Sequence, residues 1–447
     1  MSKLKRLSVD RTEFSGLMKP YGPFERYPTL AVAYSGGSDS TALLFLADRW
    51  ARQRRAKVVA LTVDHGLRPE SKQEVCIAQK RCRKLGIESH LLRWLAPKIN
   101  SGIQNAARNA RYSLLSDWCK KRNILHLLVA HNLEDQAETI LHRLGRRTGL
   151  DGLAGMPAVR EMQNIRLVRP CINVSRQRLR ATLNENNIKW LEDPSNNNLS
   201  YARVRLRRLL PTLTKEQISP TMLSGTARRL SSVRRSLERN VSKVLAENAM
   251  MFPEGYSRIA RKAFSNSETE VARRVLEILL CSIGGSLYPP NGRKVDRLLQ
   301  TLKNEMIFKS RTLGGCKIAL KDHYVLIFRE AKRCQNTIIR PGKTIFWDGR
   351  FFVRIGKTNN LTMKDYFLGS LGGKFCPKIR KIITKMEKNS APKDVLMALP
   401  VIRDLDGIIG LPDFGHGRKK KKSVSLMQVV VQFAPQRPVT NANFFLV

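Results

Sequence analysis

The chain has 447 residues, of which 42% are hydrophobic and 26% charged, a composition typical of globular proteins with a sizeable core. Its 81 lysines and arginines outnumber 36 acidic residues, and the formal net charge of +45 favours a polyanionic partner such as nucleic acid. A basic composition shared across the lineage is the alternative. The eight cysteines form no C-x-x-C pair, which argues against a structural zinc, iron–sulfur or thioredoxin-type site.

The amino-terminal segment contains no apolar core of the kind found in secretion signals, and no run of about 18 apolar residues occurs in the chain. We therefore expect a soluble, cytoplasmic protein that does not enter a membrane. A cleaved organelle transit peptide is the alternative, although Asp10 and Glu13 interrupt its basic start. The sequence leaves the oligomeric state open, with a homodimer as one option.

The first half of the chain alternates short apolar runs with segments of helical periodicity. The predicted strands are residues 30–35, 57–65, 87–94 and 124–131, and the predicted helices are residues 40–53, 69–86, 103–122 and 134–147. This alternation predicts a Rossmann-like α/β fold, with a parallel sheet covered by helices on both faces. Ligands of such sheets bind beyond the carboxyl ends of the strands, where polar clusters follow the first, second and fourth strands.

We expect three domains. The first is the α/β domain, over residues 1–213. A mainly helical linking domain follows over 214–335, and it contains the basic segment 227–240. Short apolar runs separated by glycine and proline predict a small α+β domain over 338–447, in which residues 418–422 form a run of five cations. The last two domains are the predicted contacts for RNA.

The strongest local motif lies between the first predicted strand and the first predicted helix. It consists of Ser35, Gly36, Gly37, Ser38, Asp39 and Ser40. Glycines allow the backbone to approach a ligand closely, and the helix N-terminus offers free N–H groups, so the motif predicts a phosphate-binding loop. No Gly-Lys-Ser/Thr closes it, so it is not a Walker A motif. The alternative is a plain turn capped by Ser38 or Ser40.

Two further polar clusters follow predicted strands. Asp64 and His65 end the second strand and are candidate nucleoside-binding residues, with Arg68 nearby; an Asp-capped turn is the alternative. His131 ends the fourth strand, and Asp135 and Glu138 lie three residues apart on one helical face. Such carboxylates can hold Mg²⁺ or accept a proton, and capping of the helix is the alternative.

These motifs resemble those of the PP-loop family of ATP pyrophosphatases, and within it those of the tRNA(Ile)-lysidine synthetases. The resemblance is strong over residues 28–213, through AVAYSGGSDSTALL, TVDHGLRPES, QNAARNARYSLL, VAHNLEDQAET and LVRPCINVSRQRLR, and weaker beyond. The chain departs from the family pattern at Asn132, where a second histidine is usual, at Glu134, where aspartate is usual, and at Val204, where asparagine is frequent.

The resemblance implies a ligase that uses ATP and Mg²⁺ to adenylate the wobble cytidine of tRNA(Ile) with the anticodon CAU, after which free L-lysine displaces AMP. It also implies roles for individual residues. The loop 35–40 would hold the pyrophosphate, with Asp64 and His65 beside the nucleotide, and Asp39 and Asp135 would hold the metal. The residues around the cytidine, the lysine and the charged intermediate would be His131, Asp135, Glu138, Arg111 and Arg205.

Three alternatives remain at this point. A PP-loop tRNA cytidine thiolase usually needs paired cysteines, which this chain lacks. A GMP synthetase-like amidotransferase would leave the net charge of +45 unexplained. An inactive RNA-binding relative would be indicated by the loss of Asp39, Asp135 or Glu138, and all three are present.

Overall fold

The computed structural model describes most of the chain. The described residues are 7–64, 66, 71–94, 103–146, 148–162, 164–192, 198–200, 202–305, 308–355, 365–372, 392–404, 407–412 and 427–439. They divide into two compact units, with the boundary in the chain between Ser236 and Leu237. The division into three domains at 213 and at 335–338 stays a prediction.

The first unit is built on a six-stranded sheet in the order β3-β2-β1-β4-β6-β5. Its strands are β1 (Thr29–Ala33), β2 (Lys57–Asp64), β3 (Glu88–Arg93), β4 (His126–Leu128), β5 (Val159–Glu161) and β6 (Arg166–Val168). All neighbouring strands are parallel except β5, which runs antiparallel to β6 at the edge. The predicted parallel α/β sheet is therefore confirmed.

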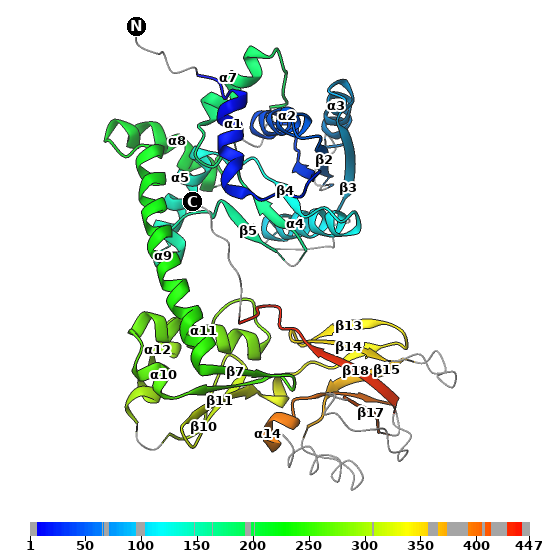
Figure 1. Ribbon diagram of the computed structural model, residues 1–447, viewed down its shortest axis with the longest axis vertical. Helices are drawn as coiled ribbons and strands as arrows, with labels where there is room; N and C mark the ends of the chain where they lie inside the picture. The colour runs from blue at the N-terminus through cyan, green and yellow to red at the C-terminus, as the bar shows by residue number, and fades with distance from the viewer. Residues whose placement is uncertain are drawn as a thin grey trace. The chain divides into compact units, whose positions relative to one another are not determined.

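Helices cover both faces of this sheet, because successive residues of β1 pack into apolar clusters on opposite sides of it. Leu30 and Val32 pack in one apolar cluster with α1 (Arg11–Met18), α2 (Ser38–Arg52), α3 (Ser71–Lys84) and α7 (Arg176–Glu185). Ala31 points the other way, into a cluster with α4 (Ile103–Lys121). Figure 1 shows α4 and α2 on opposite sides of the strands. Because successive strand residues face opposite ways, both faces of this apolar strand are buried.

The order of the strands places the loop after the first predicted strand next to the loop after the fourth. β1 lies between β2 and β4, so the chain leaves the carboxyl ends of β1 and β4 side by side. The loop after β1 leads into α2, and the loop after β4 leads into α5 (Leu133–Leu144). This is the point where the strand order reverses, at which doubly wound sheets bind their ligands.

Two helices extend the first unit beyond the sheet. They are α8 (Ala202–Lys215) and α9 (Pro220–Asn248), and the second of them continues into the second unit. Ala137 and Ile140 of α5 share a small apolar cluster with Leu210 of α8 and Leu223 of α9. Packing of this kind fixes the position of α8 relative to α5, and therefore relative to the carboxyl edge of the sheet.

The second unit contains two largely antiparallel sheets. The first has the order β7-β8-β11-β10-β9, built from β7 (Ala249–Phe252), β8 (Tyr256–Ala260), β9 (Arg311–Leu313), β10 (Cys316–Lys321) and β11 (Tyr324–Arg329). Its core is shared with α10 (Lys262–Ser265), α11 (Thr269–Gly284) and α12 (Gly292–Asn304). The sequence predicted helices over this segment but not the sheet, because its strands have only three to six residues.

The second sheet has the order β12-β15-β16-β17-β18-β14-β13, in which only β17 and β18 pair in parallel. Its strands are β12 (Thr337–Ile339), β13 (Thr344–Trp347), β14 (Phe351–Ile355), β15 (Tyr366–Ser370), β16 (Pro400–Arg403), β17 (Ile408–Pro412) and β18 (Met427–Phe433). With the short helix α14 (Lys393–Leu396), this agrees with the α+β character expected near the C-terminus. Among the described helices, none has the length and apolarity required to cross a lipid bilayer.

Candidate active site

The loop between β1 and α2 has a shape that only glycine permits at its second position. Gly36 has a φ of +83°, in the left-handed region, and a Cβ there would lie 2.8 Å from Cδ1 of Leu191. The Leu191 backbone N–H donates to the Gly36 carbonyl oxygen at 2.8 Å. The chain can turn this tightly because Gly36 has no side chain, and the turn aims the amino end of α2 at the carboxyl edge of the sheet.

Hydroxyl groups hold this loop together from the inside. The Ser40 hydroxyl donates to the Gly37 carbonyl oxygen at 3.0 Å and accepts the Ser35 backbone N–H at 3.3 Å. The Thr41 hydroxyl donates to the Gly36 carbonyl oxygen at 3.2 Å. Ser40 therefore braces the loop instead of capping the helix. Gly37 is the N-cap of α2 and provides no side-chain cap. Backbone N–H groups in this first turn are therefore available to an anion, as phosphate binding requires.

An arginine joins the two carboxylates predicted to hold a metal. Arg176, the first residue of α7, has its Nε atom 3.2 Å from Oδ2 of Asp39 and its Nη2 atom 3.3 Å from Oδ1 of Asp135. Its backbone N–H donates to Oε2 of Glu134 at 2.9 Å. The structure thus brings Asp39, from the loop after β1, and Asp135, from the helix after β4, to one guanidinium group.

Asp135 also belongs to the N-terminal cap of α5. Its backbone N–H donates to Oδ1 of Asn132 at 2.9 Å, and its carboxylate accepts the Asn132 N–H at 3.2 Å, which forms a capping box. Burial raises the pKa of Asp135 to about 6, with Arg176 acting in the opposite direction and Glu138 and Asp39 reinforcing the rise. The asparagine that departs from the family pattern therefore has a clear structural use.

Glu138 is the most deeply buried of the predicted carboxylates, with only 1% of its side chain exposed. Its Oε1 atom lies 2.7 Å from Nε of Arg207, on α8. The Nη2 atom of the same arginine lies 3.9 Å from Oδ1 of Asp135. The two carboxylates of the predicted helical face are thus part of a chain of alternating negative and positive side chains. Its members are Asp39, Arg176, Asp135, Arg207 and Glu138.

His131 lies three residues beyond the end of β4, in the loop that leads to α5, so the predicted strand was too long. Its Nδ1 atom accepts a hydrogen bond from Nε of Arg169 at 3.0 Å. Burial, followed by the charges of Arg169 and other arginines, lowers the pKa of His131 well below its ordinary value. The ring is therefore neutral at physiological pH.

The remaining predicted residues are less closely gathered. Arg111 is partly buried, its guanidinium carbon lies 5.5 Å from the ring centre of Tyr112, and burial lowers its pKa. Arg205 is exposed and donates to the carbonyl oxygens of Leu199 and Ser200 at 2.7 and 2.9 Å. Asp64 accepts the Gly66 N–H at 2.9 Å in a turn. His65, Arg68 and the run 418–422 lie outside the described residues.

Sequence reasoning missed three arginines that contact the predicted residues. They are Arg169, Arg176 and Arg207. Arg207 lies two residues from Arg205, and positions two apart on a helix face different ways, so the choice between them needed the helix to be placed. Arg176 directly follows the N-cap serine of α7, and this position at a helix start was the one local signal for it.

The residues present fit a magnesium ion that is bound together with phosphates. No group of three or more histidine, cysteine, aspartate or glutamate side chains suited to a metal occurs among the described residues. Mg²⁺ is commonly held by only one or two carboxylates, with water and substrate phosphates completing its shell. Asp39 and Asp135, which converge on one arginine beside the phosphate-binding loop, supply that number of carboxylates.

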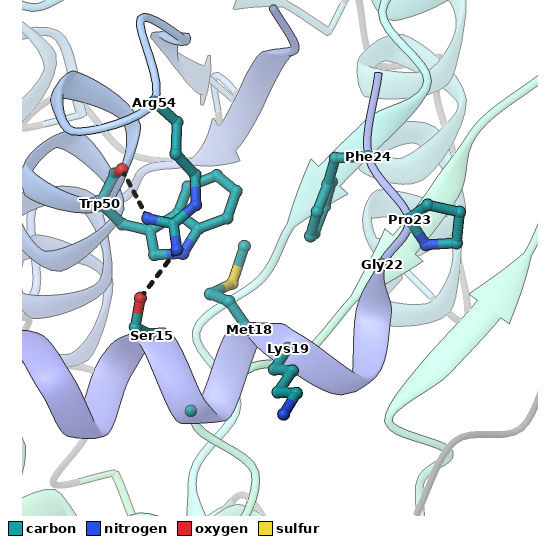
Figure 2. Close-up of a pocket in the computed structure, with 9 residues that line it drawn as sticks. Ser15, Met18, Lys19, Gly22, Pro23, Phe24, Trp50 and Arg54 are labelled. Carbon is teal, nitrogen blue, oxygen red and sulfur yellow. Dashed lines mark hydrogen bonds between the residues drawn. The ribbon is translucent and has the colours of Figure 1, made fainter. Parts of the chain in front are cut away.

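A cavity of about 360 Å³ in the same unit is separate from these residues. It lies between α1 and the C-terminal end of α2, as Figure 2 shows, and so at the amino ends of the strands. The guanidinium group of Arg54 lies 4.4 Å from the ring centre of Trp50 and donates to the hydroxyl of Ser15 at 3.0 Å. None of the predicted site residues lines this cavity.

The open helix terminus and the paired carboxylates at the switch point define an α/β domain that binds nucleotide phosphates. Residues 8–213 match the family model described as the PP-loop domain. The chain is 32% identical to tRNA(Ile)-lysidine synthase of Wolbachia pipientis wMel, covering 87% of this chain and 90% of the relative. It is 34% identical to the same enzyme of Ruegeria pomeroyi (79% and 82%) and 29% to that of Orientia tsutsugamushi (92% and 95%). The chain belongs to the tRNA(Ile)-lysidine synthase family and is an enzyme.

Proposed function

We propose that this enzyme ligates L-lysine to C2 of the wobble cytidine of tRNA(Ile) with the anticodon CAU, using ATP and passing through an adenylated tRNA. The observation that carries the proposal is the pairing of Asp39 and Asp135 on Arg176 directly beside the uncapped N-terminus of α2. This arrangement supplies backbone donors for phosphates and two carboxylates for chemistry within one site. The family membership supports the same choice of substrates.

In the first half-reaction, O2 of the cytidine attacks the α-phosphorus of ATP and pyrophosphate leaves. The N–H groups at the start of α2 would bind the departing phosphates, and Gly36 allows the backbone to approach them. Mg²⁺, held by Asp39 and Asp135, would neutralise phosphate charge when it is bound. Arg176 would then exchange part of its contact with these carboxylates for phosphate oxygens, since a guanidinium group binds both anions in the same manner.

In the second half-reaction, the side-chain amine of lysine attacks C2, the new C–N bond forms, and AMP leaves with the oxygen. The amine must lose a proton before it can attack. Asp135, when it is not holding Mg²⁺, would accept this proton, because burial raises its pKa to about 6. Glu138 is paired with Arg207, and its negative charge helps to raise the pKa of Asp135. Arg111, from α4, and Arg205, from α8, would face the charged intermediate.

The net charge of +45 supports tRNA as the partner, since phosphates of the RNA would be neutralised by lysine and arginine. A cytoplasmic location, where tRNA, ATP and free lysine are all present, is part of the proposal. A homodimer stays an option.

Incorporation of lysine into RNA tests the proposal. The full chain is incubated with ATP, Mg²⁺, labelled lysine and tRNA(Ile) carrying the CAU anticodon, and RNA-bound label is counted. We expect label that depends on ATP and is absent from a methionine tRNA with the same anticodon. Label that appears without ATP, or equally in both tRNAs, would contradict the proposal. A tRNA(Ile) in which the wobble cytidine is replaced by uridine is the matched control and should stay unlabelled.

A further inference from the structure

The orientation of the His131 ring is fixed by a neighbour that is itself rigidly held. Nε of Arg169 donates to Nδ1 of His131 at 3.0 Å. Only 4% of Arg169 is exposed. Its Nη1 atom donates to the carbonyl oxygen of Pro157 at 2.7 Å, and its backbone N–H donates to the carbonyl oxygen of Ala158 at 2.8 Å. The guanidinium group therefore has a single direction in which it meets the imidazole.

This contact decides which ring nitrogen carries the proton. A guanidinium group has only donors, so the Nδ1 atom that it contacts must act as the acceptor. Burial lowers the pKa of Arg169 to about 10, which still leaves it charged at neutral pH. A neutral His131 must then carry its proton on Nε2, the nitrogen on the other side of the ring. The ring presents an N–H group, because its one lone pair is already used.

Among the described residues, the charges that act most strongly on His131 are all positive. Arg169 acts from the loop after β6, Arg108 and Arg111 from α4, and Arg203 from α8, and each disfavours a protonated imidazole. The ring is thus kept neutral within a group of cations. A neutral N–H donor in such a place suits an oxygen that carries negative charge, for which a phosphoryl group is the natural candidate in a nucleotide-binding site.

We propose that His131 donates a hydrogen bond from Nε2 to a phosphoryl oxygen of the adenylyl group during its transfer, and that Arg169 is the positioning residue that imposes the required tautomer. This inference rests on the proposed function for the identity of the phosphoryl group. It excludes His131 as the base that deprotonates lysine, because the ring nitrogen that could accept a proton is occupied by Arg169. That role is left to Asp135.

Nuclear magnetic resonance tests the tautomer without any reliance on activity. The full chain is labelled with ¹⁵N at its seven histidines, and the His131 signals are identified by their loss in His131→Gln. We expect a neutral ring with the proton on Nε2 at pH 7. Arg169→Met should release a mixture of tautomers and raise the pKa of His131, whereas Arg169→Lys, which keeps a charged donor, should preserve the wild-type tautomer. A proton on Nδ1, or an imidazolium at pH 7, in the unmodified chain would overturn the proposal.

Two variants test the donor role. The amide nitrogen of Gln can occupy the place of Nε2, while Asn reaches only as far as Nδ1, so His131→Gln keeps the proposed donor and His131→Asn loses it. We expect the first to adenylate tRNA within about tenfold of the wild-type rate, and the second to lose about a hundredfold, the effect of a hydrogen bond to a charged group. Equal losses would indicate a base and would overturn the donor role.

The acceptor is identified with ATP whose α-phosphate carries sulfur in place of either non-bridging oxygen. Wild-type enzyme should prefer one of the two diastereomers, and His131→Asn should lose at least tenfold of that preference. An unchanged preference in the variant would place the acceptor elsewhere, on the cytidine, and would overturn the phosphoryl assignment. If the unmodified chain adenylates no tRNA at all, the proposed function fails, while the spectroscopic test of the tautomer still stands on its own.

Discussion

The Oε1 atom of Glu138 lies 2.7 Å from Nε of Arg207, and this ion pair ties the helix after β4 to α8. The carboxylate is almost fully buried, whereas about a third of the arginine side chain is exposed. The pair therefore links two roles, because it fixes the packing of α5 against α8 and places a charge next to Asp135. Removal of this ion pair should therefore lower both the stability of the first unit and the reaction rate.

Glu138→Ala should destabilise the first unit by about 1–3 kcal/mol, because Arg207 loses its shortest ion-pair contact at a desolvated position. Denaturant unfolding followed by a probe in the first unit measures the change. The matched variant is Glu138→Met combined with Arg207→Met, which removes both charges and should be less destabilised than Glu138→Ala. If the effects of the single variants Glu138→Met and Arg207→Met add up to that of the double variant, the pair contributes no coupling and this interpretation of the contact is wrong.

Asp39→Asn should leave the fold intact but abolish transfer of AMP to tRNA. The amide still fits the first turn of α2, yet it loses the charge that pairs with Arg176 and that would hold Mg²⁺. Release of pyrophosphate from ATP in the presence of tRNA is the measurement. Asp48→Asn is the control on the same helix, since Asp48 pairs only with Arg52 among the ion pairs of the described residues and should leave the rate unchanged. Near-normal pyrophosphate release from Asp39→Asn would refute the role.

The pKa of Asp135, raised to about 6, gives a pH dependence of stability with a definite sign. The folded protein holds this proton more tightly than the unfolded chain does, so the free energy of unfolding should fall as pH rises from about 4 to 6 and level off above that. Asp135→Asn should remove this part of the slope, which is at most about 2–3 kcal/mol. The measurement compares the two proteins without ATP and with a chelator present. A wild-type protein that instead gains stability relative to the variant over this range would contradict the assignment.

Replacement of the basic run 418–422 with serine should weaken tRNA binding and make it less dependent on salt, with ATP binding unchanged. The run carries five adjacent cations, and each cation that contacts a phosphate contributes roughly one unit or less to the salt slope. Binding of tRNA measured between about 50 and 200 mM salt gives the slope. These residues lie outside the described part of the structure, so the prediction stands on sequence alone. An unchanged slope would mean that they form only a solvated loop.

The sheet of the first unit could be predicted because its strands are buried on both faces. Leu30, Ala31 and Val32 form a continuous apolar run, and the glycines that follow them mark the loop without any knowledge of the rest of the fold. The antiparallel sheet from β7 to β9 could not be found in the same way. Its strands have only three to six residues, and their pairing depends on residues far apart in the chain, such as those of β8 and β11, which are 64 to 72 positions apart.

The carboxylates of the site could also be predicted, but not their partners. Asp39 and Asp135 follow strands whose ends are neighbours in a parallel sheet, so topology alone brings them near each other. Arg176 and Arg207 come from helices that follow much later in the chain. Apart from the position of Arg176 at the start of a helix, no local pattern among the 81 lysines and arginines points to these two residues. Only the packing of α7 and α8 selects them.

Single-turnover chemistry with ATP labelled at the α-phosphate tests the central claim most directly. Enzyme in excess is mixed with ATP and tRNA(Ile) with the CAU anticodon, first without lysine and then with it. The account predicts that label accumulates on the RNA while lysine is absent, and that added lysine releases it as AMP at the rate at which lysine becomes bound to the RNA. Lysine transfer without any label on the RNA, or RNA-bound label that added lysine does not release, would contradict an adenylated tRNA as the intermediate.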